Sequence, residues 1–195
     1  MKHLDIALGL VAAAVLLACD PSTTDGDQDQ KRTAGGETTS QGKEVTKAVC
    51  VLRGTAGNEG VQGVVVFTKQ GEGVKVEANV SGLSPGEHGF HVHALGDINC
   101  DDGKCTGDHF NPTNEKHGGP DSEERHAGDL GNISVGDDGK GTYNRVDRVV
   151  KLNGPHSVIG RAMIVHAGRD DLTSQPSGDA GARLAYGVIG IAEEK

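Results

Sequence analysis

The stretch Gly89-Phe90-His91-Val92-His93 is the place in this chain where fold and chemistry can be inferred together. If this run is a β-strand, His91 and His93 point to the same face, because side chains alternate along a strand. Two imidazole nitrogens held side by side on a stiff element form half of a transition-metal site. The pair therefore predicts a metal-binding strand.

Further metal-ligand residue types follow within the next eighty or so positions. Imidazole and carboxylate are among the side chains that bind copper and zinc in proteins. Histidines crowded by chance would more often lie on the surface, so the prediction of a metal site rests on the full set of seven residues and not on the pair alone. The candidate ligands are His91, His93, His109, His117, His126, Asp129 and His166.

The remainder of the chain from Val45 onward has the pattern of short strands separated by turns. The expected strands are Lys47–Arg53, Gly63–Thr68, Val74–Ser81, Gly89–His93, Ala127–Val135, Gly141–Val146, Val158–Val165 and Ala185–Ile191. Turn clusters such as Ser84-Pro85-Gly86 divide them. Two connections are long, Ala94–His126 and Ala167–Leu184, and long loops inside a compact domain are usually functional. The pattern predicts an all-β sandwich or barrel with two functional loops.

The composition is consistent with this architecture. Glycine makes up 31 of 195 residues, aromatic residues only 3%, and tryptophan is absent, so the core must consist of Val, Ile, Leu and Ala. The formal net charge is -9. Nucleic acids require basic surfaces, so a nucleic-acid partner is not expected.

The N-terminal residues have the pattern of a targeting segment. Ile6 to Ala18 is apolar but short for a membrane span, and Leu16-Leu17-Ala18-Cys19 resembles the lipobox of bacterial lipoproteins. We expect residues 1–18 to be a signal peptide that is cleaved before Cys19, which then carries the lipid. Simple secretion is the alternative. Asp20 resembles the signal for retention in the inner membrane, which predicts an anchored protein facing the periplasm.

Residues 19–44 form the expected linker. They contain Asp, Thr, Ser, Gln and Gly and almost no apolar side chains, so they cannot bury enough surface to fold on their own. We expect a flexible acidic tether, followed by one domain at 45–195.

Several motifs, in this order, resemble those of the copper/zinc superoxide dismutases. The resemblance covers about Lys47 to Ala192 and implies an eight-stranded Greek-key β-sandwich or flattened barrel. It rests on Gly89-Phe90-His91-Val92-His93, Gly107-Asp108-His109-Phe110-Asn111-Pro112, Lys116-His117-Gly118-Gly119-Pro120, Glu124-Arg125-His126-Ala127-Gly128-Asp129, Ile164-Val165-His166 and Gly181-Ala182-Arg183-Leu184-Ala185.

The resemblance implies a role for each candidate. Arg183 would orient superoxide above copper, Asp170 would link a copper histidine to a zinc histidine, and His109 would bridge the metals and take part in proton transfer. The reaction would be dismutation of superoxide to oxygen and hydrogen peroxide as copper cycles between Cu(II) and Cu(I). The implied copper ligands are His91, His93, His109 and His166, and the zinc ligands His109, His117, His126 and Asp129.

The chain departs from the family in its cysteines. The family ties its first long loop to the last strand with a disulfide, but Tyr186 stands at the strand position, and Cys105 is interpreted as the remnant of the loop half. An exported protein permits disulfides, so we predict a local Cys100–Cys105 bridge, with two free thiols as the alternative. Tyr186 is expected to pack there and to donate its hydroxyl to a loop carbonyl.

The second departure from the family concerns the charged residues that would attract superoxide to the site. The segment Ser174-Gln175-Pro176-Ser177-Gly178 is short and uncharged where many relatives carry Glu and Lys. We expect Arg169 to substitute for the lysine.

Two functions remain open. The first is a dismutase; the second is an envelope lipoprotein that buffers copper and zinc on the same fold without turnover. A pure binding protein has no need of Arg183, which favours the enzyme.

The runs Ala48–Leu52 and Gly187–Ile191 resemble the dimer-forming segments of the eukaryotic-type enzymes and predict a homodimer.

Overall fold

The computed structural model describes residues 43–193, so the predicted signal peptide, Cys19 and nearly all of the linker lie outside the described residues. Within the described part, no helix is long and apolar enough to cross a membrane. The elements are β1 Lys47–Gly54, β2 Gln62–Gln70, β3 Gly73–Ser81, β4 Gly86–His93, η1 Lys104–Thr106, β5 Asp129–Val135, β6 Lys140–Asp147, β7 Ala162–His166 and β8 Arg183–Ile191.

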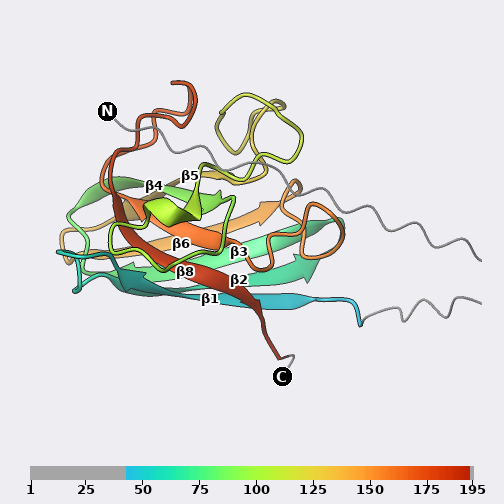
Figure 1. Ribbon diagram of the computed structural model, residues 1–195, viewed down its shortest axis with the longest axis horizontal. Helices are drawn as coiled ribbons and strands as arrows, with labels where there is room; N and C mark the ends of the chain where they lie inside the picture. Colours follow the sequence, from blue (N-terminus) through green and yellow to red (C-terminus); the bar gives the residue numbers. More distant parts are fainter. Residues whose placement is uncertain (1–42, 194–195) are drawn as a thin grey trace, which may run out of the picture. The chain divides into compact units, whose positions relative to one another are not determined.

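The eight strands close into an antiparallel barrel in the order β1-β2-β3-β6-β5-β4-β7-β8 (Figure 1). Strand β3 lies beside β6 and β4 beside β7, so the chain crosses between neighbours as in a Greek key. The expectation of an all-β, eight-stranded domain is confirmed. Its two long connections run over residues 94–128 and 167–182.

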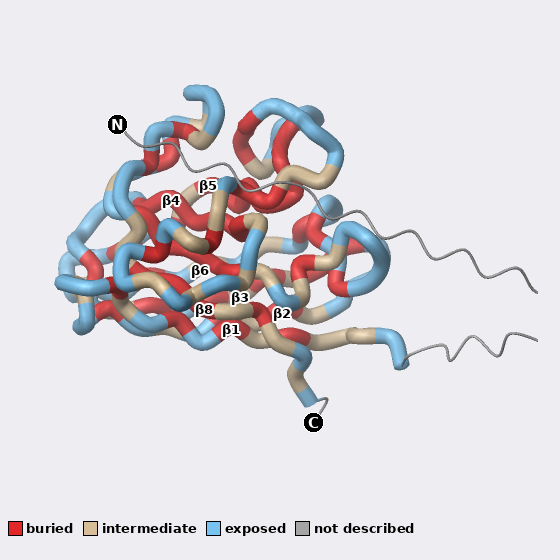
Figure 2. The backbone as a smooth tube through the Cα atoms, viewed as in Figure 1, coloured by how far each residue is buried: buried red, intermediate tan, exposed pale blue. Residues whose placement is uncertain are grey.

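The core follows from alternation along the strands. In β1, Ala48, Cys50 and Leu52 are buried between more exposed neighbours, and Val65 and Phe67 of β2 are fully buried. Burial raises the pKa of the Cys50 thiol to about 12, so Cys50 is a small apolar residue of the core. Buried residues also occur in the long loops beside β4 and β5 (Figure 2).

Two strands begin later than the sequence pattern indicated, β5 at Asp129 instead of Ala127, and β7. We expected a strand from Val158, but β7 starts at Ala162, because residues 158–161 form a turn in which the amide of Arg161 donates to the carbonyl of Val158 at 3.1 Å. Val158 is buried in that turn, so its apolar character does not indicate a strand. Conversely, β4 begins earlier than expected, at Gly86.

A buried ion pair fixes the first long loop to the barrel. The Nη2 atom of Arg125 donates to Oδ2 of Asp147 at 2.6 Å, and both side chains are almost completely buried. Nη1 of Arg125 donates to the backbone carbonyl of Asp129 at 2.9 Å, and Oδ1 of Asp147 accepts from the amides of Val149 and Val150. The pair therefore ties the segment that carries His126 to strand β6.

Candidate metal centre

Strand β4 divides its side chains between the core and the site. Phe90 and Val92 are fully buried in the hydrophobic core. His91 and His93 point to the other face, where the long loops cover them to 0% and 1% exposure. The strand is therefore buried on both faces from His88 to His93, and its two histidines form the floor of the site.

The predicted copper ligands come together as one group. Nδ1 of His93 lies 2.8 Å from the carbonyl oxygen of Gly107, and Nδ1 of His166 lies 3.1 Å from that of Gly181. With both Nδ1 atoms occupied, the Nε2 atoms face each other at 3.3 Å. The four residues that present ligand atoms within 4.8 Å of one another are His91, His93, His109 and His166.

The predicted zinc ligands form a second group, which shares His109 with the first. Oδ1 of Asp129 lies 2.7 Å from Nδ1 of His109 and 3.1 Å from Nδ1 of His126, and its Oδ2 lies 3.1 Å from Nδ1 of His117. Burial alone would raise the pKa of Asp129, but hydrogen bonds from the three histidines hold it well below its usual range. A carboxylate surrounded by three imidazoles is the donor set of a structural zinc site.

Asp170 connects the two groups from the second long loop. Its Oδ2 lies 2.8 Å from Nε2 of His91 and its Oδ1 lies 2.9 Å from Nε2 of His117. Asn132 of β5 fixes the backbone of Asp170 with two hydrogen bonds of 2.7 and 2.9 Å. Because each imidazole uses Nε2 toward Asp170, its Nδ1 is left to face a metal.

The donor atoms suit metal ions. Two buried ring nitrogens have no hydrogen-bond partner among the described residues, Nδ1 of His91 and Nε2 of His109. Nδ1 of His117 faces Oδ2 of Asp129, the carboxylate of its fellow candidate zinc ligand. Orphaned buried nitrogens are rare unless something other than the protein contacts them. Burial lowers the pKa of His91 to about 4 and that of His166 to about 3. Both are therefore neutral imidazoles at pH 7, the form that binds metal.

His117 behaves differently in the absence of metal. Burial lowers its pKa, but its pairing with Asp129 and Asp170 outweighs this effect and raises the pKa to about 9. In the metal-free protein at pH 7 it is an imidazolium between two carboxylates. Zinc would take the place of that proton.

The short uncharged segment of the second loop holds His117 in position. Gln175 clamps the backbone of His117, since its Oε1 accepts from the amide and its Nε2 donates to the carbonyl, both at 2.9 Å. Gly178 has a left-handed backbone with φ of 68°, and a Cβ there would lie 1.8 Å from Oδ1 of Asp170 and 2.6 Å from Nε2 of His117. Neither contact could be predicted from the sequence, because no periodic pattern links positions 117 and 175.

Arg183, at the start of β8, lies at the edge of a cavity of about 580 Å³ that is also lined by His93, His109 and His166. Its Nη1 donates to the carbonyl of Gly103 at 2.6 Å and to Oγ1 of Thr106 at 2.9 Å, and its Nη2 donates to the carbonyl of Gly107 at 2.7 Å. Burial lowers the pKa of Arg183, but an arginine in a protein remains protonated at neutral pH. A fixed cation thus lies beside the histidines.

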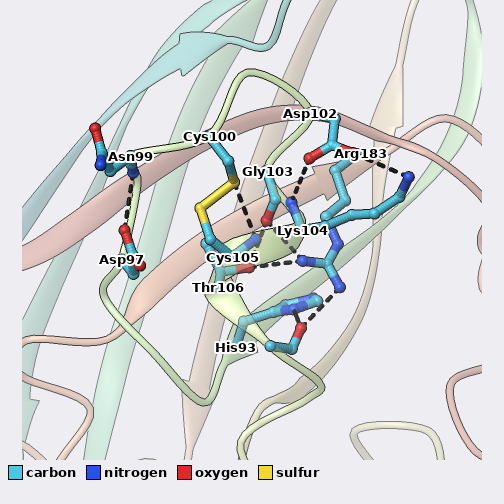
Figure 3. The surroundings of a disulfide bond; sticks show 11 residues. His93, Asp97, Asn99, Cys100, Asp102, Gly103, Lys104, Cys105, Thr106 and Arg183 are labelled. Atoms are coloured by element: carbon cyan, nitrogen blue, oxygen red, sulfur yellow. Dashed lines mark hydrogen bonds and ion pairs between the residues drawn. A yellow bond between two sulfur atoms is a disulfide. The ribbon is translucent and has the colours of Figure 1, made fainter. Parts of the chain in front are cut away.

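The predicted disulfide between Cys100 and Cys105 is confirmed (Figure 3). Tyr186 packs against this loop at Gly103, where a Cβ would lie 3.3 Å from Cδ1 of Tyr186, and Ile98 packs against the apolar cluster that contains Tyr186. The aromatic ring fills the space beneath the loop, and Arg53 packs over it with Cζ 5.2 Å from the ring centroid. Tyr186 therefore acts through its ring; the expected hydroxyl bond to a loop carbonyl is not among the hydrogen bonds of residues 43–193.

The structure does not support the steering role expected for Arg169. Its Nε lies 2.7 Å from Oε2 of the exposed Glu87, and its side chain is not among those that line the cavity. The neighbouring carboxylate neutralises its charge. Arg183 and Arg161 are the arginines of the cavity wall.

Comparisons with known proteins agree with this arrangement. A family model described as copper/zinc superoxide dismutase matches residues 61–189. Among solved structures, that of the clock protein EA4 is similar, with a TM-score of 0.70 and 40% sequence identity over 76% of this chain and 96% of that chain.

Proposed function

The chain belongs to the copper/zinc superoxide dismutase family, and from that premise we propose that it dismutates superoxide to oxygen and hydrogen peroxide. The observation that carries the proposal is the position of Arg183 on the wall of the cavity lined by His93, His109 and His166. A site that only stores metal has no use for a cation there. A site that admits a small anion does.

The two histidine groups would hold copper at His91, His93, His109 and His166 and zinc at His109, His117, His126 and Asp129. Copper would supply a one-electron redox couple, and zinc would fix the geometry of its ligands. These two metals are the cofactors that the donor sets favour.

The protein side chains supply charge and protons. Arg183 attracts superoxide and orients it, since a guanidinium in a cleft concentrates anions there. His109 belongs to both ligand groups, and its buried Nε2 has no protein partner. We propose that this atom takes up one proton and delivers it to the reduced product, which takes a second proton from water and leaves as hydrogen peroxide.

A metal-buffering protein without turnover is the second candidate function. The observation that favours it is that the similar solved structure is named for a clock protein and not for a dismutase. The same fold and a 40% identical sequence therefore occur under a name that states no such activity.

The experiment that separates the two candidates measures superoxide consumption and metal content on one purified sample. For a dismutase we expect one copper and one zinc per chain, as the two ligand groups predict, with rapid turnover that is lost in His109→Ala. Full occupancy of both metals with negligible turnover would establish the buffering function.

We also propose that a lipid on Cys19 anchors the protein to a membrane facing the periplasm or another extracytoplasmic space. The support is the sequence Leu16-Leu17-Ala18-Cys19, and Asp20 favours the inner membrane. Mass spectrometry of the mature N-terminus tests this proposal. An unmodified Cys19, or cleavage elsewhere, would contradict it.

A homodimer is the proposed assembly. Val51 of β1, the paired Val64 of β2 and Ile191 at the end of β8 are 67%, 42% and 66% exposed. Exposed apolar side chains on adjacent strands favour a protein contact. Sedimentation equilibrium of the wild-type protein and of Val51→Glu tests it: a dimer that the substitution dissociates supports this surface, and a wild-type monomer contradicts it.

A further inference from the structure

We propose that the Cys100–Cys105 bridge positions Arg183, so that its oxidation state sets how the site receives an anion. The inference rests on the proposed function, because it concerns regulation of the same site. One hydrogen-bond acceptor of Arg183, the Gly103 carbonyl, lies inside the ring that the bridge closes, and the other two follow Cys105 directly, at Thr106 and Gly107 (Figure 3).

The acceptors of Arg183 are all neutral. They are the carbonyl oxygens of Gly103 and Gly107 and the hydroxyl of Thr106. Among residues 43–193, no carboxylate lies within ion-pair distance of this guanidinium. Its position therefore depends on where the loop backbone places these three oxygens.

The bridge determines the local backbone. Gly103 lies between the two cysteines with a left-handed φ of 73°, immediately before η1. The amide of Cys105 donates to Sγ of Cys100 at 2.9 Å. The Gly103 carbonyl accepts from the amide and the hydroxyl of Thr106 at 3.2 and 2.9 Å as well as from Arg183. The disulfide thus closes the turn that holds the Gly103 carbonyl, and Thr106 is connected to that turn through its two bonds to this carbonyl.

The bridge closes the loop on itself, and within the described residues no disulfide ties the loop to β8. Below Gly103 lies the ring of Tyr186, which offers contact but no covalent link. If the bridge opens, the turn keeps its hydrogen bonds, among them that from the Ala56 amide to the Asp101 carbonyl at 2.8 Å, and loses the covalent closure that restricts it. We expect Gly103 and Thr106 to become mobile and the Arg183 guanidinium with them.

The bridge is accessible to a thiol reagent. Both cysteines are only partly buried, and Cys100 lines an open groove together with Arg53, Thr55 and Tyr186. A dithiol attacks one sulfur of the bridge through its thiolate and then closes on itself. The protein disulfide gains two electrons and two protons and becomes two thiols, and the dithiol is oxidised to its cyclic disulfide.

The test compares three forms of the full protein: oxidised wild type, wild type reduced with dithiothreitol, and the double variant Cys100→Ser, Cys105→Ser. The readouts are the superoxide rate constant, the affinity of azide for the copper-loaded site, metal content, and the NMR signals of the Arg183 side-chain N–H groups in the zinc-only protein. The zinc-only form contains no copper that dithiothreitol could reduce, so copper reduction does not affect the NMR measurement. The variant treated with dithiothreitol is the control for any other effect of the reagent.

Opening the bridge should weaken azide binding and lower the rate by roughly threefold to tenfold, less than the ~100-fold loss that a 1 Å displacement can cause, because Gly107 still accepts from Arg183. The Arg183 N–H signals should broaden and exchange faster while both metals stay bound. Thr106→Val, which removes one acceptor and leaves the bridge intact, should shift the same signals.

Unchanged Arg183 signals and azide affinity in both bridge-free forms would overturn the inference, and so would a rate that falls only in proportion to lost metal. Failure of the proposed function would give a different experimental result. In that case the oxidised, metal-loaded wild type shows no turnover, while the Arg183 signals still report whether the bridge positions the guanidinium.

Discussion

His93 and Arg183 are hydrogen-bonded to the same oxygen. The carbonyl of Gly107 accepts from Nδ1 of His93 at 2.8 Å and from Nη2 of Arg183 at 2.7 Å. One backbone atom therefore sets the orientation of a proposed copper ligand and of the proposed anion-orienting group. Any movement of this carbonyl changes both together.

Replacing Arg183 should reduce the rate without removing metal. In Arg183→Gln the fixed positive charge disappears, and we expect the superoxide rate constant to fall roughly 10-fold or more, the scale of electrostatic effects on association. Its dependence on salt should weaken at the same time. Arg169→Gln is the matched control, because Arg169 already pairs with Glu87; an equal loss of rate in both variants would contradict the assignment.

Asp170→Asn should weaken zinc binding. The amide cannot accept hydrogen bonds on both of its terminal atoms from His91 and His117, and loss of such an outer carboxylate costs roughly 10- to 100-fold in metal affinity. Competition with a chromophoric chelator measures the change. The neighbouring Asp171 accepts only from residues 173 and 174 of its own turn, so Asp171→Asn should keep the wild-type affinity.

Gly178→Ala should disrupt the hydrogen bond between Asp170 and His117 by a steric clash. The new Cβ would overlap Oδ1 of Asp170 and Nε2 of His117, so zinc affinity should fall. Gly154→Ala controls for backbone strain, since Gly154 has a left-handed φ of 82° but no atom within 4 Å of the added methyl group. If the two variants lose stability equally and both keep zinc affinity, the steric argument is wrong.

Zinc binding at pH 7 should release about one proton from His117, because a metal ligand must be deprotonated and the pKa of His117 in the metal-free protein is raised to about 9. Apparent zinc affinity should therefore increase with pH until about 9. Protonation of His117 also adds to the free energy of unfolding of the metal-free protein. This contribution is complete at a pH below 6.5, the ordinary pKa of histidine, and disappears as the pH rises through about 9.

Calorimetric titration with zinc in two buffers of different ionisation enthalpy measures the proton release. Identical apparent enthalpies in the two buffers would contradict it.

Arg125→Met should destabilise the fold by about 3–5 kcal/mol, because the buried Asp147 would lose its close partner charge and keep only the longer contact from Nε of Arg145 at 3.9 Å. Urea unfolding of the metal-free protein measures the difference. Asp121→Asn is the control: its carboxylate is 89% exposed and pairs with Arg145 at the surface, where an ion pair contributes about 1 kcal/mol or less. Comparable losses in both variants would show that burial of the pair is unimportant.

The sequence predicted the strands because their pattern is local. Alternation in β1 and glycine-rich turns are visible within a few neighbouring residues, and all eight expected strands occur. The predicted start of β7 was wrong because Val158 is buried within a turn. An apolar residue alone does not distinguish a buried turn from a strand.

The site was predictable in its residue types but not in its supporting contacts. Spacing and motif order indicated the histidines, and the structure places them in two groups. Which ring nitrogen faces the metal depends on the carbonyl oxygens of Gly107 and Gly181 and on Asp170. Gln175 and Arg125 act on residues 58 and 22 positions away, and no feature of either segment by itself shows the contact.

The position of the disulfide has a consequence for the order of folding and oxidation. Its cysteines are five residues apart, and contacts within such short segments form in well under ~1 μs even in an unfolded chain. A bond from the loop to the last strand would need β8 to be near its final place before it could form. Here the oxidising step and the assembly of the barrel are independent of each other, so the chain can enter folding with the loop around Gly103 already closed.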